Sequence, residues 1–326
     1  MLGHSGSPAA TGYCGGVTGA FTPDPIPVDR IDRLTAAETA EIVTLAQAAG
    51  AADGADPLSE AVLLRLRHGG AGAHLLIRDR DDTLAGYAHV DLEDAVDGPW
   101  AEVVVHPAHR RKGLGRRLVE EALAVAREAD PRGRLRMWAH GDHPSAGALA
   151  VDLGFARSRV LLQLRRPLTQ PMPERPLPEH VHLRTFEPGR DDAAWLDLNA
   201  RAFASHPEQG RWTERDLRLR MEEPWFDPAG FLLAVERATG RLLGFHWTKV
   251  HDGTPPIGEV YVLGVDPDAH GQGLGAALAV AGLRYLRERG LDRVMLYVEE
   301  SNVAALTLYR RLGFAHWAAH VLYRHG

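Results

Sequence analysis

The sequence has very little cysteine, since its 326 residues contain only Cys14. A single cysteine excludes an internal disulfide framework and a cysteine zinc site, and we expect neither a cysteine nucleophile nor an oxidising compartment. No apolar run approaches the roughly 20 residues that a membrane-spanning helix requires. The formal net charge of -6 disfavours a protein that coats nucleic acid. These absences predict a cytoplasmic protein with no membrane or nucleic-acid partner.

The N-terminal segment lacks the marks of a targeting signal. Residues 1–25 are rich in Gly, Ser, Thr and Pro, without the basic start and apolar core of a signal peptide. We predict a disordered extension over residues 1–28. The rest of the chain has the length of two domains at roughly 150 residues each, and 45% apolar residues are enough for ordinary cores.

Two stretches of the chain repeat each other. "HRRKGLGRRL" at residues 109–118 and "AHGQGLGAAL" at 269–278 place two glycines at the same positions, and each follows a V-x-P tripeptide at the same offset. The tripeptide "LGF" recurs at 153–155 and 312–314. The distance between repeats is 160 residues at the glycines and 159 at "LGF". This register predicts a duplicated domain.

Residues 167–180 separate the two repeats. They include five prolines, which no helix interior or central strand would tolerate, so we predict a semi-rigid linker. On either side we expect an antiparallel pair of strands, a third strand, the glycine turn, a helix, a strand and a last helix. This order predicts an α+β fold of two tandem domains over residues 29–166 and 181–326, each a mixed sheet flanked by helices.

Local signals give the ranges of the main elements. Thr35 and Glu38 form a capping box that begins a helix, and Gly50 is expected to end it. The expected strands before the glycine turns are 100–105 and 259–265, and the expected helices after them are 114–128 and 274–289.

The glycine turns are candidate anion sites. A loop whose backbone amides point inward, followed by glycines that open a helix, can hold a phosphate at the helix N-terminus. An ordinary tight turn is the alternative. The stretch "GQGLGA" also fits a dinucleotide fingerprint, with Glu299 or Glu300 as the ribose contact. Four residues between the strand and Gly271, and Arg111 in place of the first glycine of the other repeat, count against that interpretation.

The motifs match a known family. "RRKGLG" at residues 110–115 resembles the R/Q-x-x-G-x-G/A acyl-CoA signature of the Gcn5-related N-acetyltransferases, and "NVAALTLYRRLGF" at 302–314 is similar to the motif that follows it in that superfamily. The resemblance implies tandem acetyltransferase-like domains whose turn amides hold the pyrophosphate of acetyl-CoA. His270 departs from the signature, which expects Gln or Arg there.

The same resemblance implies the residues that contact acetyl-CoA. In the second copy they are Leu263, Gly264, Val265, His270, Gly271, Gln272, Gly273, Leu274, Gly275, Ala276, Asn302, Val303, Ala304, Ala305, Leu306 and Thr307. In the first copy they are Val103, Val104, Val105, Arg111, Lys112, Gly113, Leu114, Gly115 and Arg116.

Acetyl transfer to an amine needs an acid for the departing thiolate. Counted back from "LGF", Tyr309 in the second copy corresponds to Ala150 in the first, which has no phenol there. The resemblance implies that a tyrosine at this helix position is the general acid, so Tyr309 is the candidate. An aromatic ring that packs under the last strand is the alternative.

The transfer also needs a base for the ammonium proton. Strand alternation predicts one shared face for Glu259, Tyr261, Leu263 and Val265. Glu259 is the candidate base, and at an offset of 160 the first copy has Pro99. Glu102 matches Val262 and lies on the opposite face unless a bulge intervenes. We therefore expect catalysis in the second copy and acyl-CoA binding without catalysis in the first.

Three further stretches narrow the acceptor. Residues 206–212, 244–251 and 258–267 closely resemble one family of these enzymes, the mycothiol synthases. The resemblance implies direct acetylation of the cysteinyl amine of cysteinyl-glucosaminyl-inositol in a ternary complex. The acceptor site that it implies consists of Glu60, Glu208, Lys249, Glu259 and Tyr297. For Glu60, Glu208 and Lys249 a solvent-exposed surface position is the alternative.

Other functions stay open at this point. A different amine acceptor, such as a peptide N-terminus or an aminoglycoside, and a non-catalytic acetyl-CoA sensor fit the same motifs. We expect no metal, because the 17 histidines include no H-E-x-x-H motif. Ser301 lies in no G-x-S-x-G turn, so a nucleophilic serine is not expected. A monomer fits the sequence, and the oligomeric state stays open.

Overall fold

The computed structural model describes residues 26–69 and 72–326, with the side chains of residues 207 and 208 left out. Residues 1–25, which hold Cys14 and most of the predicted extension, lie outside the described residues.

The first copy begins with a short strand and two helices, and three successive strands follow before the remaining helices and strands. Its elements are β1 (Asp29–Ile31), α1 (Ala36–Asp53), α2 (Glu60–His68), β2 (Ala73–Arg78), β3 (Leu84–Asp91), β4 (Trp100–Val105), the 3₁₀ helix η1 (Pro107–His109), α3 (Leu114–Ala129), β5 (Leu135–His140), α4 (Pro144–Asp152) and β6 (Ala156–Pro167).

The second copy follows the same order after an irregular segment. Its elements are β7 (Val181–Thr185), α5 (Asp192–Ala202), α6 (Pro207–Gly210), α7 (Glu214–Met221), η2 (Pro228–Gly230), β8 (Phe231–Glu236), β9 (Leu242–His251), β10 (Ile257–Val265), η3 (Pro267–Ala269), α8 (Leu274–Glu288), β11 (Arg293–Glu299), α9 (Val303–Arg311) and β12 (Ala315–His325).

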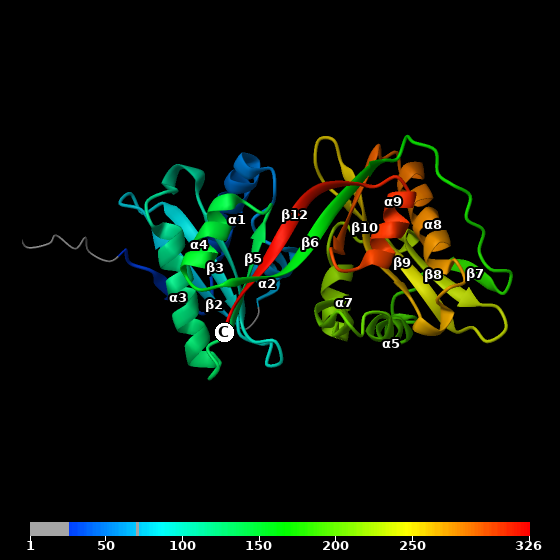
Figure 1. Cartoon of the computed structure of the whole chain (residues 1–326), viewed down its shortest axis with the longest axis horizontal. Coiled ribbons are helices and arrows are strands. Elements are labelled where there is room, and N and C mark those ends of the chain that lie inside the picture. The colour runs from blue at the N-terminus through cyan, green and yellow to red at the C-terminus, as the bar shows by residue number, and fades with distance from the viewer. Residues whose placement is uncertain (1–25, 70–71) are drawn as a thin grey trace, which may run out of the picture.

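The described strands form one mixed sheet of 12 strands in the order β1-β2-β3-β4-β5-β12-β6-β11-β10-β9-β8-β7. The two copies exchange their last strands: β12 pairs with β5 of the first copy, β6 pairs with β11 of the second, and β6 and β12 pair with each other. Figure 1 shows these two long strands side by side, crossing from one half of the molecule to the other. The predicted α+β architecture with mixed strand pairing is therefore confirmed, and hydrogen bonding makes the two sheets continuous.

Helices cover both faces of the sheet. On one face α3 packs over the first copy and α8 with α9 over the second. On the other face α1 and α2 cover the first copy, and α5 with α7 covers the second. Val321 of the α3 core pairs with Val160, which strand alternation places on the same face as Leu162 and Leu164 of the α8 core. The two cores therefore lie on the same face of the sheet. On the opposite face of the sheet, the central strands thus have α2 on one side and α5 with α7 on the other.

The end of α1 differs from the prediction. The helix continues through Gly50 to Asp53 and ends at Gly54, which has φ 69° and donates its N–H to the Gly50 carbonyl. The left-handed conformation that favours glycine is needed at residue 54, not at residue 50. The predicted capping box of Thr35 and Glu38 is confirmed.

The predicted shared face of β10 is wrong for Leu263 and Val265, whereas Tyr261 does lie on the face of Glu259. The β9–β10 ladder pairs Glu259 with Lys249 and Val262 with Trp247, and a β-bulge lies between Val260 and Val262. One extra residue in a bulge reverses the alternation beyond it. Leu263 and Val265 therefore lie on the α8 face, opposite Glu259.

Candidate active site

The two glycine turns have the same backbone. Gly113 and Gly273 precede α3 and α8 with φ 86° and 78°, and neither helix has a side-chain cap. The first helical bonds in each run from the fourth residue after the glycine back to its carbonyl. The amides of the intervening first turn therefore have no partner within the helix and can bind an anion. Two residues before each glycine, Arg111 and Gly271 also have positive φ, 63° and 79°.

The parallel strands beside each turn separate before they end. β10 pairs with β11 only from Gly258 to Val260, although β10 continues to Val265. In the first copy β4 pairs with β5 only at Trp100 and Ala101. Within the described strands, backbone groups of 263–265 on the β11 side consequently have no strand partner and are open to hydrogen bonds from an extended ligand. Their contact with the thioester stays a prediction.

The residue that departs from the acyl-CoA signature contacts the strand rather than standing free. His270 Nε2 lies 3.2 Å from the carbonyl oxygen of Val265, and the equivalent Arg110 donates its Nε–H to the Val105 carbonyl at 3.2 Å. Both side chains thus fix the loop to the end of its strand. Arg110 also makes two hydrogen bonds to Asp53, at 2.7 and 2.8 Å.

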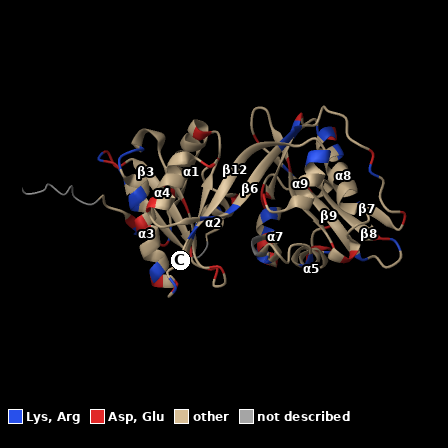
Figure 2. Ribbon diagram, in the orientation of Figure 1, with Lys and Arg blue, Asp and Glu red and all other residues tan. Residues whose placement is uncertain are grey.

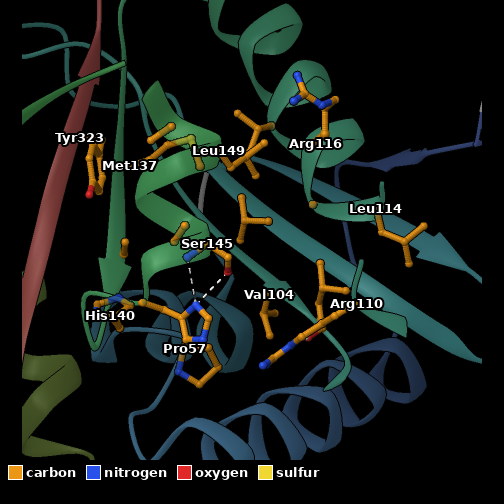
Figure 3. Close-up of a pocket in the computed structure, with 18 of the residues that line it drawn as sticks. Pro57, Val104, Arg110, Leu114, Arg116, Met137, His140, Ser145, Leu149 and Tyr323 are labelled. Atoms are coloured by element: carbon orange, nitrogen blue, oxygen red, sulfur yellow. Dashed lines mark hydrogen bonds between the residues drawn. The ribbon is translucent and has the colours of Figure 1, made fainter. Parts of the chain in front are cut away.

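The predicted acyl-CoA residues of the first copy line a cavity of about 740 Å³. Val103–Val105, Arg111 and 113–116 border it, together with β5 and α4 residues that include His140 and Leu149 (Figure 3). Lys112 instead lies 3.4 Å from the Ala108 carbonyl oxygen. Arg116 of α3 pairs with Asp152 of α4. Figure 2 shows acidic residues beside the basic ones on α3. The cavity has the size and mixed lining of a cofactor-sized ligand site.

The starts of α4 and α9 confirm the predicted correspondence of His143 with Asn302. Asn302 caps α9 by accepting a hydrogen bond from the amide of Ala305 at 3.0 Å, and His143 caps α4 by accepting from the amide of Ser145 at 3.2 Å. Residues 303–307 form the first turns of α9. This helix starts a few residues after the end of β11, as α4 starts a few residues after the end of β5.

Three predicted acceptor residues meet where the copies touch. Lys249 contacts Glu60, which begins α2 of the first copy, and Lys249 is the cross-strand partner of Glu259, so it links the two carboxylates. Lys249 and Glu259 are only 8% and 6% exposed. A surface position is therefore excluded for Lys249, and Glu60 reaches the second copy as predicted.

Charge compensation decides the ionisation of Glu60. Burial would raise the pKa of its carboxyl, but Lys249, the Tyr261 hydroxyl and Arg220 together hold it below the ordinary value. The Tyr261 hydroxyl donates to Glu60 at 2.5 Å, and Arg220 Nε donates to the Tyr261 oxygen at 2.7 Å. Burial and the neighbouring Glu60 charge raise the pKa of Tyr261 well above its usual range. Glu60 is thus a charged carboxylate held by three side chains of the second copy.

The ladder also corrects the residue that matches Glu259 in the first copy. Gly86–Val105 and Gly244–Val265 are equivalent pairs, and counting along each ladder places Trp100, not Pro99, opposite Asp91 where Glu259 lies opposite Lys249. The first copy has no bulge in this ladder, so sequence counting is one residue off. The bulge in the second copy puts Val262, the match of Glu102, on the face of Glu259, so the predicted opposite face of Glu102 is wrong.

Glu102 is fully buried rather than open to an acceptor. Its Oε2 accepts a hydrogen bond from the Ser59 amide at 2.6 Å, and its Oε1 lies 3.3 Å from His140 Nε2. His140 Nδ1 in turn lies 2.8 Å from His320 Nδ1. Burial, with the neighbouring His140, lowers the pKa of His320 to about 4. This carboxylate therefore joins the start of α2 to β5, and His140 extends the contact to β12.

Tyr309 lies in the core of the second copy. It is 7% exposed, and its ring is edge-on to Phe314 with centroids 5.5 Å apart. Burial raises the pKa of its hydroxyl, so the phenol stays protonated at neutral pH. Among the described residues no side chain or backbone group hydrogen-bonds to it. A protonated hydroxyl without a protein partner can serve as an acid, and the ring also fills the core.

Tyr297 lies on the same sheet face as Glu259, next to the exchanged strands. Gln163 of β6 donates to its hydroxyl at 2.7 Å, and its ring is edge-on to His320 with centroids 5.3 Å apart. Burial and then the charge of Glu259 raise its pKa. Glu208 cannot be compared, because its side chain lies outside the described residues.

Sequence reasoning missed several residues of this site. Arg220 and Tyr261 hold Glu60, Gln163 holds Tyr297, and His251 contacts Glu259 at 2.5 Å. Gln163 and Arg220 lie in stretches with no motif, so no local signal could place them. His251 does lie within the stretch 244–251, two residues after Lys249, and strand alternation could have put the two on one face.

Comparisons with known proteins agree with this geometry. The sequence model of the Acetyltransferase (GNAT) family matches residues 41–155 and 193–314. A mycothiol acetyltransferase of Salinispora arenicola is 65% identical over 93% of this chain and 98% of its own length. The chain belongs to the mycothiol acetyltransferases of the GNAT family. It is therefore an N-acetyltransferase of mycothiol synthesis, and acetyl-CoA is its co-substrate.

Solved structures support the tandem arrangement. A GCN5-related N-acetyltransferase from Sphaerobacter thermophilus has a TM-score of 0.70 at 28% identity, covering 93% of this chain and 96% of its own. A tandem GNAT protein from the clavulanic acid biosynthesis pathway has a TM-score of 0.71 at 21% identity, covering 92% and 98%. The second likeness shows the fold alone.

Two further features are absent from the described part of the chain. There is no group of three or more His, Cys, Asp or Glu side chains that could hold a metal ion. No helix there is long and apolar enough to cross a membrane.

Proposed function

We propose that this acetyltransferase acetylates the cysteinyl amine of cysteinyl-glucosaminyl-inositol by direct attack in a ternary complex. The observation that carries the proposal is the cluster of Glu60, Lys249 and Glu259 at the contact of the two copies, in a chain 65% identical to a mycothiol acetyltransferase. An acceptor with many hydroxyls and one ammonium needs carboxylates that accept its hydrogen bonds and a cation that donates.

A polar cavity supports a hydroxyl-rich acceptor. It has a volume of about 310 Å³ and is lined from both copies, including Arg136, Arg159, His206, Glu299 and Ser301. Glu299 lies two residues beyond Tyr297 on β11 and therefore on the same face. At about 3.3 Å per residue along a strand, a pseudo-disaccharide can extend from Glu259 past Tyr297 into this cavity.

The two candidate catalytic groups lie on opposite faces of the sheet. Tyr309 belongs to the α8–α9 core, whereas Glu259 points to the opposite face of the sheet. Groups on opposite faces can reach one reaction centre only through the opening between β10 and β11. We propose that the acetyl carbon reacts in this opening.

The proton transfers follow from this arrangement. Bound acetyl-CoA supplies the thioester that is attacked. Glu259 takes the ammonium proton, directly or through water, so that the nitrogen lone pair becomes available. Backbone groups of 263–265 on the β11 side orient the thioester, and Tyr309 donates its proton to the departing sulfur. No acyl-enzyme forms.

We propose that the first copy binds acyl-CoA without transferring its acyl group. Its glycine turn and cavity match those expected of a binding site. It has Trp100 in the position of Glu259 and Ala150 in the position of Tyr309. The domain limits 29–166 and 181–326, with the linker 167–180, remain part of this proposal.

The test incubates the purified protein with acetyl-CoA and cysteinyl-glucosaminyl-inositol and detects the product by mass spectrometry, since the acceptor's own thiol confounds a thiol assay. We expect acetylation at the cysteinyl nitrogen. Acetyl-CoA binding without product would overturn the proposed acceptor, and a screen of peptide N-termini and aminoglycosides would then identify another amine.

A further inference from the structure

The environment of Glu259 contains one unexplained partner. His251 ends β9, and its Nε2 lies 2.5 Å from Oε2 of Glu259. The Glu259 side chain is 7% exposed, while that of His251 is 32% exposed. Within the described residues His251 is the one side chain recorded at hydrogen-bond distance from this carboxylate.

The other charged groups near Glu259 are engaged elsewhere. Lys249, its cross-strand partner, contacts Glu60, and its ammonium lies 4.5 Å from the ring centre of Trp225. Tyr297 on β11 receives its hydrogen bond from Gln163, and Asp56 acts on Tyr297 by its charge. His251 is therefore the group whose hydrogen bond acts on Glu259 directly.

We propose that His251 is a positioning residue for the general base, donating its Nε2–H to Oε2 of Glu259 and leaving Oε1 to receive the proton of the acceptor ammonium. The inference rests on the proposed role of Glu259. In the step, the N–H bond of the ammonium breaks, an O–H bond forms at Oε1, and the nitrogen keeps the electron pair that attacks the acetyl carbon.

The physical need for such a donor comes from burial. A carboxylate removed from water loses the solvation that favours its charged form, and a carboxyl that is already protonated cannot accept a proton. A short hydrogen bond to the charged form offsets this loss. The bond also fixes the carboxylate plane, so that one oxygen always points away from His251.

The test is the pH dependence of kcat/KM for the acceptor in His251→Leu and His251→Gln. Leucine removes the donor, whereas the glutamine amide can donate from nearly the Nε2 position. We expect the acid-side midpoint of His251→Leu to move up by about one pH unit, a tenfold loss on that side, with little loss on the alkaline plateau. His251→Gln should keep the wild-type midpoint.

Controls separate this inference from the proposed function. His316→Leu, at an exposed histidine of β12, should leave the profile unchanged. An unmoved midpoint in His251→Leu, or an equal loss at every pH, would overturn the positioning role. If His251→Leu does not fold, His251→Asn replaces it, because its shorter amide cannot reach Oε2. Wild-type turnover in Glu259→Gln would instead refute the base itself.

Discussion

At the scale of single residues, the carboxylate of Glu60 and the hydroxyl of Tyr309 differ in their hydrogen-bond partners. Glu60 is bound by Lys249, Tyr261 and Arg220, whereas the Tyr309 hydroxyl has no partner among the described residues. Loss of the Glu60 carboxylate would leave the buried cations beside it without their counter-charge. Loss of the Tyr309 hydroxyl would break no hydrogen bond. We therefore expect substitution of Glu60 to lower stability, and substitution of Tyr309 to lower activity while stability is kept.

Replacing Tyr309 by Phe should lower kcat by about a hundredfold to ten-thousandfold, the usual cost of a lost general acid. Its thermal unfolding should stay close to wild type, because the ring still packs on Phe314. Steady-state product formation and a melting curve measure both. Tyr323→Phe, a buried tyrosine of β12, is the matched control. Near-normal turnover would remove Tyr309 from the mechanism.

Replacing Glu60 by Gln should lower the free energy of unfolding by about 1–3 kcal/mol at neutral pH, because Lys249 loses its counter-charge. The folded-state pKa of Glu60 is below its ordinary value of 4.5. This stability is therefore present above about pH 4.5 and is lost as the pH falls through the folded pKa. Denaturant unfolding from pH 7 to 3 should show the two proteins converging. Glu41→Gln, which removes a half-exposed pair with Arg78, should change stability less.

Site residues could be predicted from the sequence where they lie within a recognisable motif. Lys249, Glu259 and Glu60 were named from the resemblance, and the structure brings them together across 189 residues of chain. Arg220 and Gln163 could not be named, and Tyr261 was placed on the face of Glu259 without a role, since these roles arise from tertiary contacts. Only the folded sheet shows that Gln163 of the first copy reaches Tyr297 of the second.

At the scale of elements, the glycine turn was readable from sequence and the bulge was not. Gly113 and Gly273 stand where the backbone needs positive φ, and only a few residue types adopt that conformation readily. A bulge adds one residue to a strand without a fixed composition, so alternation placed Tyr261, Leu263 and Val265 on one face. The same insertion misaligned Pro99 with Glu259.

Replacing Gly273 by Ala should raise the KM for acetyl-CoA more than the KM for the acceptor. Its φ of 78° costs an alanine about 1 kcal/mol or more, and the new methyl group would stand at the helix start where the anion must approach. Gly290→Ala is the control, since its φ is 80° and open space likewise surrounds it, but it follows the far end of α8. Equal KM values in the two variants would contradict an anion site at Gly273.

At the scale of the whole molecule, the exchanged strands join the two copies. β6 lies between β12 and β11, and β12 lies between β5 and β6. Sequence could predict the duplication but not the exchange, because either terminal strand could pair beside either β5 or β11 with the same alternation. Non-local strand pairing is fixed by the assembled sheet.

A chain cut between Glu174 and Arg175, both exposed, should remain one active particle. We expect the two coexpressed pieces to elute together in size exclusion and to acetylate the acceptor near the wild-type rate. Each piece expressed alone should aggregate, because it would expose unpaired strand edges. Two well-folded pieces that elute apart would contradict the exchange.

The shared sheet also bears on how such a gene can change. A duplicated gene whose products fold separately can lose one copy without harm to the other. Here deletion of the first copy would remove β6, the strand on which β11 and β12 both depend, and deletion of the second would remove β12 from β5. Selection for folding alone therefore keeps both copies, whichever of them carries out the chemistry.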